Sequence, residues 1–305
     1  MASYKLVTYA GADGPRAGLV IGDEVCDAAT LTGRAGDQSV LGILQDWTAG
    51  RERLGNGAGS PVAGQPLATT KLLTPILWPS AIYCAGANYA DHAAEMARAS
   101  GRSPEPDPHT LGLKPWHFLK AGRSTLAAPD DTVQITGLSK TMDWEIELAA
   151  VIGLAAKNVP LAAALDYVAG YTIANDLSAR DMGRRPNVPD KAPFKFDWVA
   201  HKNFDGSCPL GPWIVPSRDI PDPQQLGLKL WVNDVIKQDS NTSQMIFTLA
   251  EQIAHLSSRI TLQPGDVILT GTPAGVGAAR PEFLKPGDVV KLWIENIGTL
   301  TNRMA

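Results

Sequence analysis

Cysteine is scarce in this chain of 305 residues, which contains Cys26, Cys84 and Cys208 and no others. The three are widely spaced, and no C-x-x-C pair occurs. An odd number of scattered cysteines argues against a disulfide framework. We therefore expect a protein of a reducing compartment, most simply the cytoplasm.

Long apolar runs and basic runs are also lacking. The longest nearly continuous apolar segment, Leu148–Ala156, is far shorter than the roughly 20 residues that cross a bilayer. The first residues do not show the charged-then-apolar pattern of a signal peptide. The net charge is −4, which disfavours nucleic acid as a partner. The expected partner is a small molecule, without membrane or nucleic acid.

The composition is that of a globular protein, with 44% apolar and 19% charged residues. Strand-like segments outnumber helical ones and do not alternate with them regularly, which predicts a mixed or antiparallel β core, an α+β or mainly β fold. Helical spacing is found at Ser39–Trp47 and Ser243–Leu256. Between residues 48 and 70 the chain turns to Gly, Ala, Arg and Pro, which indicates a linker. We expect a small N-terminal α+β domain (residues 1–71) and a larger catalytic domain (residues 72–305).

One stretch, Met142–Gly153, carries an unusual charge pattern. Asp143, Glu145 and Glu147 alternate with apolar residues, so they share one face of an extended chain. An enclosed face of this kind would need a cation with oxygen ligands to relieve the repulsion. A solvated face of an antiparallel strand would need none. The stretch alone leaves both interpretations open.

Other polar residues are weak signals when each is taken alone. His92 and Glu95 are three residues apart and share a helical face, as many surface pairs do. Asp176 ends a strand-like segment, and Lys202 lies in a polar and aromatic one. The turn Gly271–Gly277 lacks the G-K-[ST] ending of a phosphate loop, which excludes that type of nucleotide site.

Taken together, these residues fall in five motifs that resemble the fumarylacetoacetate hydrolase superfamily. The motifs, in chain order, are G-A-N-Y-A-D-H-A-A-E-M, D-W-E-I-E-L-A-A-V-I-G, Y-T-I-A-N-D-L-S-A-R-D, K-N-F-D-G-S-C-P-L-G-P-W and L-T-G-T-P-A-G-V-G. The resemblance covers residues from about 72 to the C-terminus. It implies mixed β-strands rolled into a barrel-like core, usually in a homodimer.

The resemblance also implies a metal site. Glu145, Glu147 and Asp176 would bind one divalent cation, Mg²⁺ or Mn²⁺, with Ca²⁺ as a further candidate. Asp143 would lie behind these ligands. A set of carboxylates suits such hard cations better than zinc or copper.

The implied substrate is a β-diketone such as an acylpyruvate, a 2,4-dioxo acid whose C–C bond is hydrolysed through a metal-held enolate. His92 and Glu95 would activate water, and Lys202 would stabilise negative charge. The expected substrate-binding residues are Arg180, Thr272, Asn88 and Lys120. Relatives with the same ligands include oxaloacetate decarboxylases, hydroxymuconate-type isomerases and keto-acid lyases, which remain alternatives.

Two segments bear on substrate access. Ala93–Gly112 is interrupted by Pro and Gly and carries Glu95, so we expect a lid that completes the site on closure. Trp116, His117 and Trp198 either add aromatic surface for a bulky substrate or pack in the core or a subunit interface.

Overall fold

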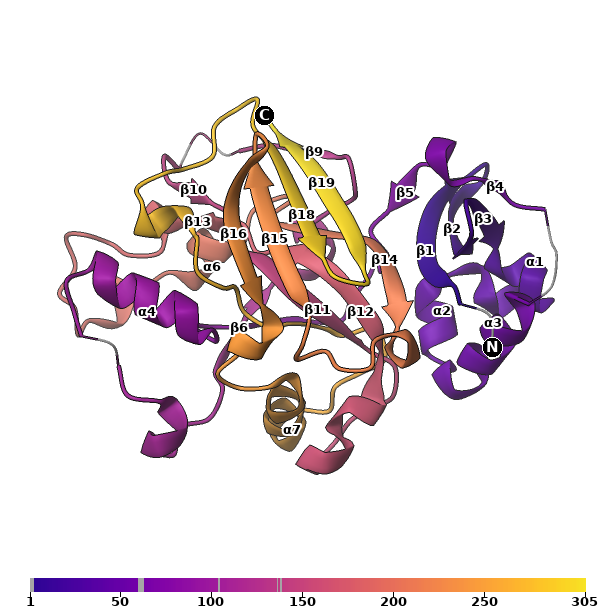
Figure 1. Cartoon of the computed structure of the whole chain (residues 1–305), viewed down its shortest axis with the longest axis horizontal. Helices are drawn as coiled ribbons and strands as arrows, with labels where there is room; N and C mark the ends of the chain where they lie inside the picture. Colours follow the sequence, from indigo (N-terminus) through magenta and orange to yellow (C-terminus); the bar gives the residue numbers. More distant parts are fainter. Residues whose placement is uncertain (1–2, 60–62, 104, 136, 138) are drawn as a thin grey trace.

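The computed structural model describes residues 3–59, 63–103, 105–135, 137 and 139–305. Two sheets dominate it, and the N-terminal residues form a smaller lobe beside the larger body (Figure 1). No helix among the described residues is both long enough and apolar enough to cross a membrane. The helices are α1 (Ala28–Thr32), α2 (Val40–Leu44), α3 (Trp47–Gly57), α4 (Ala90–Ala99), α5 (Gly122–Thr125), α6 (Trp198–Lys202) and α7 (Leu249–Arg259).

The larger sheet is mixed and extends from the N-terminal lobe into the body. Its strands run in the order β4 (Gln65–Pro66), β3 (Glu24–Asp27), β2 (Gly14–Ile21), β1 (Lys5–Gly11), β14 (Cys208–Pro216), β12 (Val168–Asn175), β11 (Ile146–Ile152), β17 (Val267–Leu269), β6 (Ile82–Ala85) and β7 (His117–Lys120), with β5 (Leu72–Leu73) on β1 and β8 (Leu126–Ala127) on β14. Most neighbours are antiparallel, whereas β17 and β6 are parallel.

The second sheet has the order β16 (Val235–Asn241), β15 (Gly227–Val232), β18 (Val289–Ile294), β19 (Gly298–Met304) and β9 (Thr132–Val133). A separate short pair joins β10 (Met142–Asp143) to β13 (Ser178–Ala179). The mainly β, α+β fold is confirmed. The barrel-like core takes the form of two open sheets packed face to face, because neither strand order closes on itself.

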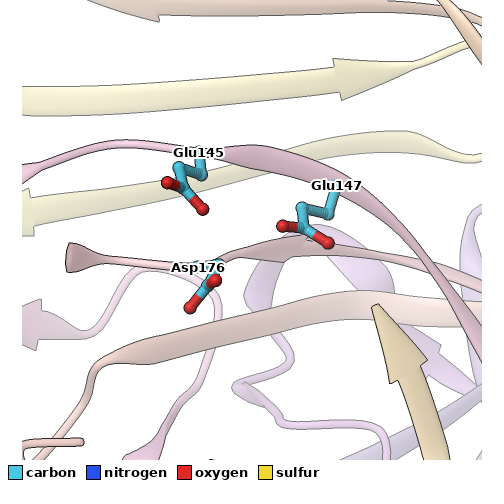
Figure 2. A group of neighbouring side chains, drawn as sticks. All are labelled: Glu145, Glu147 and Asp176. Carbon is cyan, nitrogen blue, oxygen red and sulfur yellow. The ribbon is translucent and has the colours of Figure 1, made fainter. Parts of the chain in front are cut away.

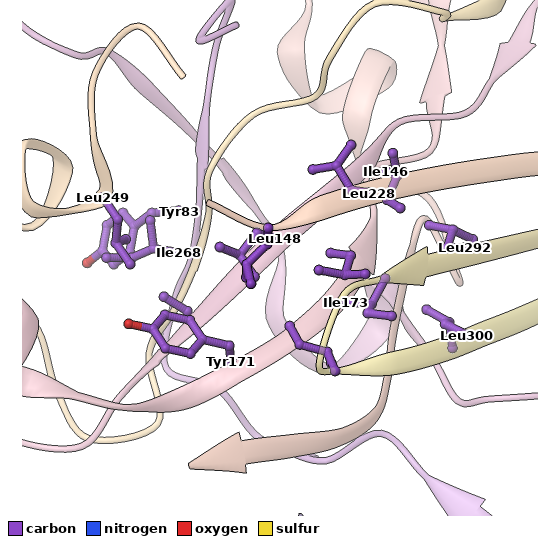
Figure 3. Close-up of a cluster of buried hydrophobic side chains, with 14 of the residues drawn as sticks. Tyr83, Ile146, Leu148, Tyr171, Ile173, Leu228, Leu249, Ile268, Leu292 and Leu300 are labelled. Atoms are coloured by element: carbon purple, nitrogen blue, oxygen red, sulfur yellow. The ribbon is translucent and has the colours of Figure 1, made fainter. Parts of the chain in front are cut away.

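Strand β11 separates two apolar cores. Ile146 and Leu148 point toward the smaller sheet and pack in one cluster with Leu228 and Leu292 (Figure 3). Ala149 and Val151 point the other way, into a cluster that includes side chains of α2 and α3. Glu145 and Glu147 share the parity of this second face, so one strand delivers both the core contacts and the carboxylates.

The linker predicted for residues 48–70 is wrong over its first part, because Trp47–Gly57 forms α3. The glycines that suggested a loop permit close packing instead. A Cβ on Gly50 would lie 3.0 Å from the carbonyl oxygen of Ile43, and one on Gly57 would lie 3.3 Å from Leu31. Trp47 in turn packs against Gly153 of the larger body. The domain boundary near residue 72 stays a prediction.

Both predicted helices exist with different limits. The segment Ser39–Trp47 contains α2, whose N-cap Ser39 accepts a hydrogen bond from the Gly42 N–H. Helix α7 begins only at Leu249, because Thr248 and Glu251 form a reciprocal capping box there. The preceding residues Thr242–Gln244 form a short 3₁₀ turn capped by Asn241.

The Asp27 carboxylate joins β1, β2 and α1 of the N-terminal lobe, and the stability of the lobe should therefore depend on pH. Asp27 accepts hydrogen bonds from Tyr9, Arg16 and Thr30. Burial alone would raise the pKa of Asp27, but these bonds outweigh it and lower the pKa to about 2. A lowered pKa stabilises the folded state above the unfolded value and loses this effect as the pH falls.

We expect Asp27→Asn to lower the melting temperature at pH 7, and the difference from the parent to shrink as the pH falls from about 4 toward 2. Thermal unfolding across this pH range measures it. Asp23→Asn, in a turn of the same lobe, is the control. A difference that does not change with pH would contradict the assigned role.

Candidate metal centre and active site

Three buried carboxylates from neighbouring strands converge. Ile146 of β11 pairs with Asn175 of β12, and the Asp176 N–H bonds the Glu145 carbonyl at 2.9 Å. This register brings Asp176 beside Glu145 and Glu147 (Figure 2). Each residue offers one oxygen, and these oxygens lie within 4.8 Å of one another. Of the two interpretations of the acidic stretch, an enclosed face and a solvated one, the structure therefore supports the enclosed face.

Cationic side chains surround two of the three carboxylates. Lys202 Nζ lies 2.8 Å from Glu145 Oε2 and 2.6 Å from Asp176 Oδ2. Arg180 Nη2 lies 2.5 Å from Glu145 Oε1, and Lys120 Nζ lies 2.9 Å from Asp176 Oδ1. Burial raises the pKa of Glu145, but Lys202 and Arg180 outweigh burial and lower it. Glu145 is thus held as an anion.

Glu147 lacks this compensation. It accepts a hydrogen bond from the Gly271 N–H at 2.6 Å, but no cationic side chain among the described residues lies within ion-pair distance of it. Burial, followed by the charges of Asp176 and Glu145, raises the pKa of Glu147. A divalent cation between the three carboxylates would remove this penalty, and the all-oxygen donor set suits Mg²⁺ or Mn²⁺. The residues therefore fit the metal that the sequence led us to expect.

Asp143 is not part of the three-carboxylate group and instead organises the loop that ends at Gly277. It accepts from Arg180 Nε at 2.8 Å and from the backbone N–H groups of Gly277 (2.6 Å) and Ala278 (3.0 Å). A Cβ on Gly277 would lie 2.7 Å from Asp143 Oδ1. Asp143 thus fixes both Arg180 and the end of the Gly271–Gly277 turn.

A cavity of about 190 Å³ opens onto the carboxylates. Its lining includes most of the predicted polar residues, namely His92, Glu145, Glu147, Arg180, Lys202 and Thr272, together with Trp116, Phe118, Trp198 and His201. Trp116 and Trp198 meet edge to face at 5.4 Å between ring centroids. His117 is not among the lining residues and instead stacks near His255 at 6.5 Å.

His92 and Glu95 lie on α4, but they do not bond each other. The buried His92 Nδ1 has no hydrogen-bond partner among the described residues. Glu95 Oε2 accepts from the Gly275 N–H at 2.7 Å. Burial lowers the pKa of His92 and outweighs the opposing charge of Glu145. His92 is therefore neutral at pH 7 and can accept a proton, while the water-activating pair stays a prediction.

Thr272 is oriented by Gln238, which the sequence analysis missed. Gln238 Nε2 donates to Thr272 Oγ1 at 2.9 Å and to the Pro273 carbonyl, while its Oε1 accepts from the Ile146 N–H. Since the Thr272 oxygen accepts one bond, its proton is free to donate into the cavity. Strand β16 is otherwise exposed or half-buried, and the buried Gln238 within it is the only sequence signal for this role.

Two predicted substrate-binding residues have structural partners instead. Lys120 Nζ bonds Asp176, the Leu177 and Ser207 carbonyls and, at a very short contact, the Lys202 carbonyl. The Asn88 amide bonds both backbone groups of Phe247 and the Thr270 carbonyl. Neither residue lines the cavity, so the geometry does not favour their binding substrate.

His201 is a second residue that the sequence analysis missed. It lies next to Lys202 on α6 and lines the cavity, and its buried Nε2 has no hydrogen-bond partner among the described residues. Burial and the charge of Lys202 lower the pKa of His201 to about 3. A neutral imidazole in this place could donate or accept one hydrogen bond to a ligand.

Comparison with known proteins decides the family. The family model described as fumarylacetoacetate (FAA) hydrolase C-terminal matches residues 81–305. The chain belongs to the fumarylacetoacetate hydrolase family. The five sequence motifs had led to the same family, and all five lie within the matched residues.

Family members of several activities resemble this chain. Oxaloacetate tautomerase fahd2, mitochondrial, from Xenopus laevis is 43% identical over 233 residues, which cover 76% of this chain and 67% of the relative. The crystal structure of maleylpyruvate hydrolase from Sphingobium sp. SYK-6 with manganese(II) and pyruvate is 31% identical, with a TM-score of 0.76, covering 99% of this chain and 98% of that one. The 5-carboxymethyl-2-hydroxymuconate delta-isomerase from Mycobacterium smegmatis is 32% identical, with a TM-score of 0.73, covering 99% of both.

This family member is therefore an enzyme of a group that includes hydrolases, isomerases and tautomerases. One relative is described as mitochondrial, and the cytoplasmic location expected here stays a prediction. The expected lid over Ala93–Gly112 also stays a prediction. Its first part is α4, and His109 ties its later part to α7 through Glu251 at 3.0 Å.

Removal of the Glu147 carboxylate should weaken cation binding without unfolding the protein. We expect Glu147→Gln to weaken Mn²⁺ binding by about 100-fold, as measured by titration calorimetry. The metal-free variant should unfold at or above the parent's temperature, because a neutral amide replaces a buried carboxylate that lacks a cationic partner. Glu52→Gln, on the exposed face of α3, is the control. Unchanged Mn²⁺ affinity in Glu147→Gln would exclude this site.

The Thr272 hydroxyl should matter for turnover rather than for folding. We expect Thr272→Val to lower kcat by about 100-fold and Thr272→Ser to restore most of it, since Ser keeps the donor that Gln238 orients. Steady-state kinetics and melting temperatures of both variants measure this. Equal kcat values for Val and Ser would show that the hydroxyl donates nothing to the reaction.

Proposed function

We propose that this chain hydrolyses a C–C bond in a 2,4-dioxo acid of the acylpyruvate type, with the help of a divalent cation. The observation that carries the proposal is that His92, neutral and with a buried nitrogen that has no hydrogen-bond partner among the described residues, shares one cavity with Glu145 and Glu147, two of the three clustered carboxylates. A base, a cation site and a hydroxyl donor then converge on one small volume.

The bound cation would be held by Glu145, Glu147 and Asp176 and would polarise the oxygens of the 2-oxo acid head as a Lewis acid. His92 takes a proton from water, and the hydroxide oxygen adds to the C4 carbonyl carbon. The C3–C4 bond then breaks, and its electron pair passes to the pyruvate fragment, which gains a proton at C3 from His92. The products are pyruvate and a carboxylic acid, so atoms and charge balance.

The surrounding residues suit these steps. Lys202 and Arg180 keep positive charge beside the carboxylates, where negative charge builds up on the substrate. Thr272 can donate its proton to a developing oxyanion or to the substrate carboxylate. For water activation by the pair, Glu95 must leave the Gly275 N–H and turn to His92, which is the kind of step that closure of α4 would bring about.

The comparisons support this proposal and also a second candidate. The maleylpyruvate hydrolase was solved with manganese(II) and pyruvate, and pyruvate is the fragment that acylpyruvate hydrolysis releases. The second candidate is keto–enol tautomerisation of oxaloacetate, the activity named for the 43% identical relative. The bond between Glu95 and Gly275 favours it, because tautomerisation needs His92 to move a proton but needs no attacking water.

We further propose Mg²⁺ or Mn²⁺ as the resident cation, a keto acid as the small-molecule substrate, a homodimer as the assembly and the cytoplasm as the location. Hard oxygen ligands with room for water favour the cation choice. The aromatic residues exposed near the cavity, Phe194, Phe196 and Trp198, are compatible with a subunit interface.

The test follows loss of the substrate and release of pyruvate in parallel. Loss of the ultraviolet enol absorbance of acylpyruvates is followed with Mg²⁺, with EDTA, and with His92→Ala, while pyruvate is assayed enzymatically. We expect cation-dependent loss with equimolar pyruvate, and a fall of 10²- to 10⁴-fold in His92→Ala. Oxaloacetate is assayed under the same conditions, where tautomerisation would appear as a loss of enol absorbance without release of pyruvate.

Glu95→Gln separates the two candidates, because it removes the group that would orient His92 for water activation. Loss of pyruvate release with retained enol conversion would support hydrolysis as the parent activity. Oxaloacetate enol conversion in the parent, with no pyruvate from any acylpyruvate, would replace the hydrolase by the tautomerase. His255→Gln, outside both the small cavity and the larger one beside it, is the matched histidine control.

A further inference from the structure

A larger cavity adjoins the catalytic one. It has a volume of about 670 Å³, and its lining shares Gly86, Ala87 and Trp116 with the cavity at the carboxylates. The remaining wall is mostly apolar, formed by Ala90, Ala93 and Ala94 of α4, by Pro106, Pro108 and Leu113, and by Met245, Ile246 and Phe247. We call this second cavity the groove. Its volume lies in the range of small-molecule sites.

Trp116 lines both cavities. Its indole lies against the backbone of Gly86, where a Cβ would be 1.9 Å from Cζ2, so only glycine permits this packing. The Trp116 side chain remains 46% exposed in spite of that contact. Gly86, Ala87 and Trp116, which both linings share, are the route by which a ligand held at the carboxylates would reach the groove.

The groove has fixed walls rather than a loose covering loop. His109 bonds Asp107 and Glu251 at 3.0 Å each, and its ring lies 4.6 Å from that of Phe247. The Asn88 amide holds both backbone groups of Phe247. Because these contacts already hold the wall in place, little free energy would be lost in ordering it when a ligand binds.

Charge selects the kind of group that the groove would take. Its charged lining residues are Glu105, Asp107, His109 and Lys114. Asp107 pairs with His109, and Glu105 lies 3.7 Å from Arg102. The four lining groups sum to zero charge with His109 protonated and to −1 with it neutral, so the lining offers no surplus positive charge to a second carboxylate. An apolar wall without net charge favours an uncharged alkyl or aryl group.

We propose that the groove binds the uncharged tail of the substrate, beyond the carbonyl carbon that is attacked, and so selects acylpyruvates over oxaloacetate, which has no chain beyond its C4 carboxylate. This inference rests on the proposed function, since it needs the 2-oxo acid head at the carboxylates. Ala90, Ala93 and Ala94 are then specificity residues, because their small side chains leave the room that the tail fills.

The test uses N-alkyl oxamates, unreactive mimics of 2-oxo acids, with tails of zero to eight carbons. Binding to the protein in the presence of Mn²⁺ is measured by titration calorimetry, a readout that needs no turnover. We expect affinity to rise by about two- to fourfold for each added methylene and then to level off when the groove is full.

Ala94→Phe should remove this dependence on tail length while leaving binding of unsubstituted oxamate within about twofold. Ala99→Phe, at the exposed end of the same helix, should behave as the parent, and melting temperatures check that both variants are folded. Affinity independent of tail length in the parent, or an equal loss for short and long tails in Ala94→Phe, would overturn the inference. Failure of oxamate itself to bind with Mn²⁺ would instead overturn the proposed 2-oxo acid function, and the inference with it.

Discussion

Uneven charge compensation in a buried volume is the constraint on which the rest of this structure depends. Four carboxylates, Asp143, Glu145, Glu147 and Asp176, are all buried near one another, and three cationic side chains contact them. Burial of an unpaired charge costs several kcal/mol, so each carboxylate needs a partner. Glu147 is the member without a cationic one. The arrangement therefore favours binding of a further positive charge at this point, and this is the physical reason to expect a metal ion there.

The two-sided environment of β11 makes this concentration of charge tolerable. One face of the strand is entirely apolar and packs on the smaller sheet, which anchors the strand independently of its charges. The other face passes from Glu145 and Glu147 to Ala149 and Val151 within one strand length. The core under the N-terminal lobe thus lies directly beside the carboxylates, and the lobe contributes to the rigidity of the site although none of its residues lines the cavity.

Alternation along one strand is visible in a sequence, whereas contacts between distant segments are not. The spacing of Glu145 and Glu147 showed that they share a face, but only the family motifs joined Asp176, His92 and Thr272 to them. Gln238 was missed because a single Gln on an exposed-looking hairpin gives no signal until its bond to Thr272 is seen. Helix α3 was missed because its glycines serve close packing, which local propensity counts as a break. The four buried oxygen atoms around Lys120 come from distant segments, so the sequence could not show them.

The contact between Trp116 and Gly86 has a consequence for how this family diversifies. Both residues lie apart from the metal ligands in sequence, and neither carries a charge that the centre requires. A single exchange at either position would change the shape of the lining that the two cavities share. Substrate range can therefore change through this contact while the carboxylates and their cationic partners keep their places. The names of the similar proteins, which include hydrolases, isomerases and tautomerases, belong to one such fold.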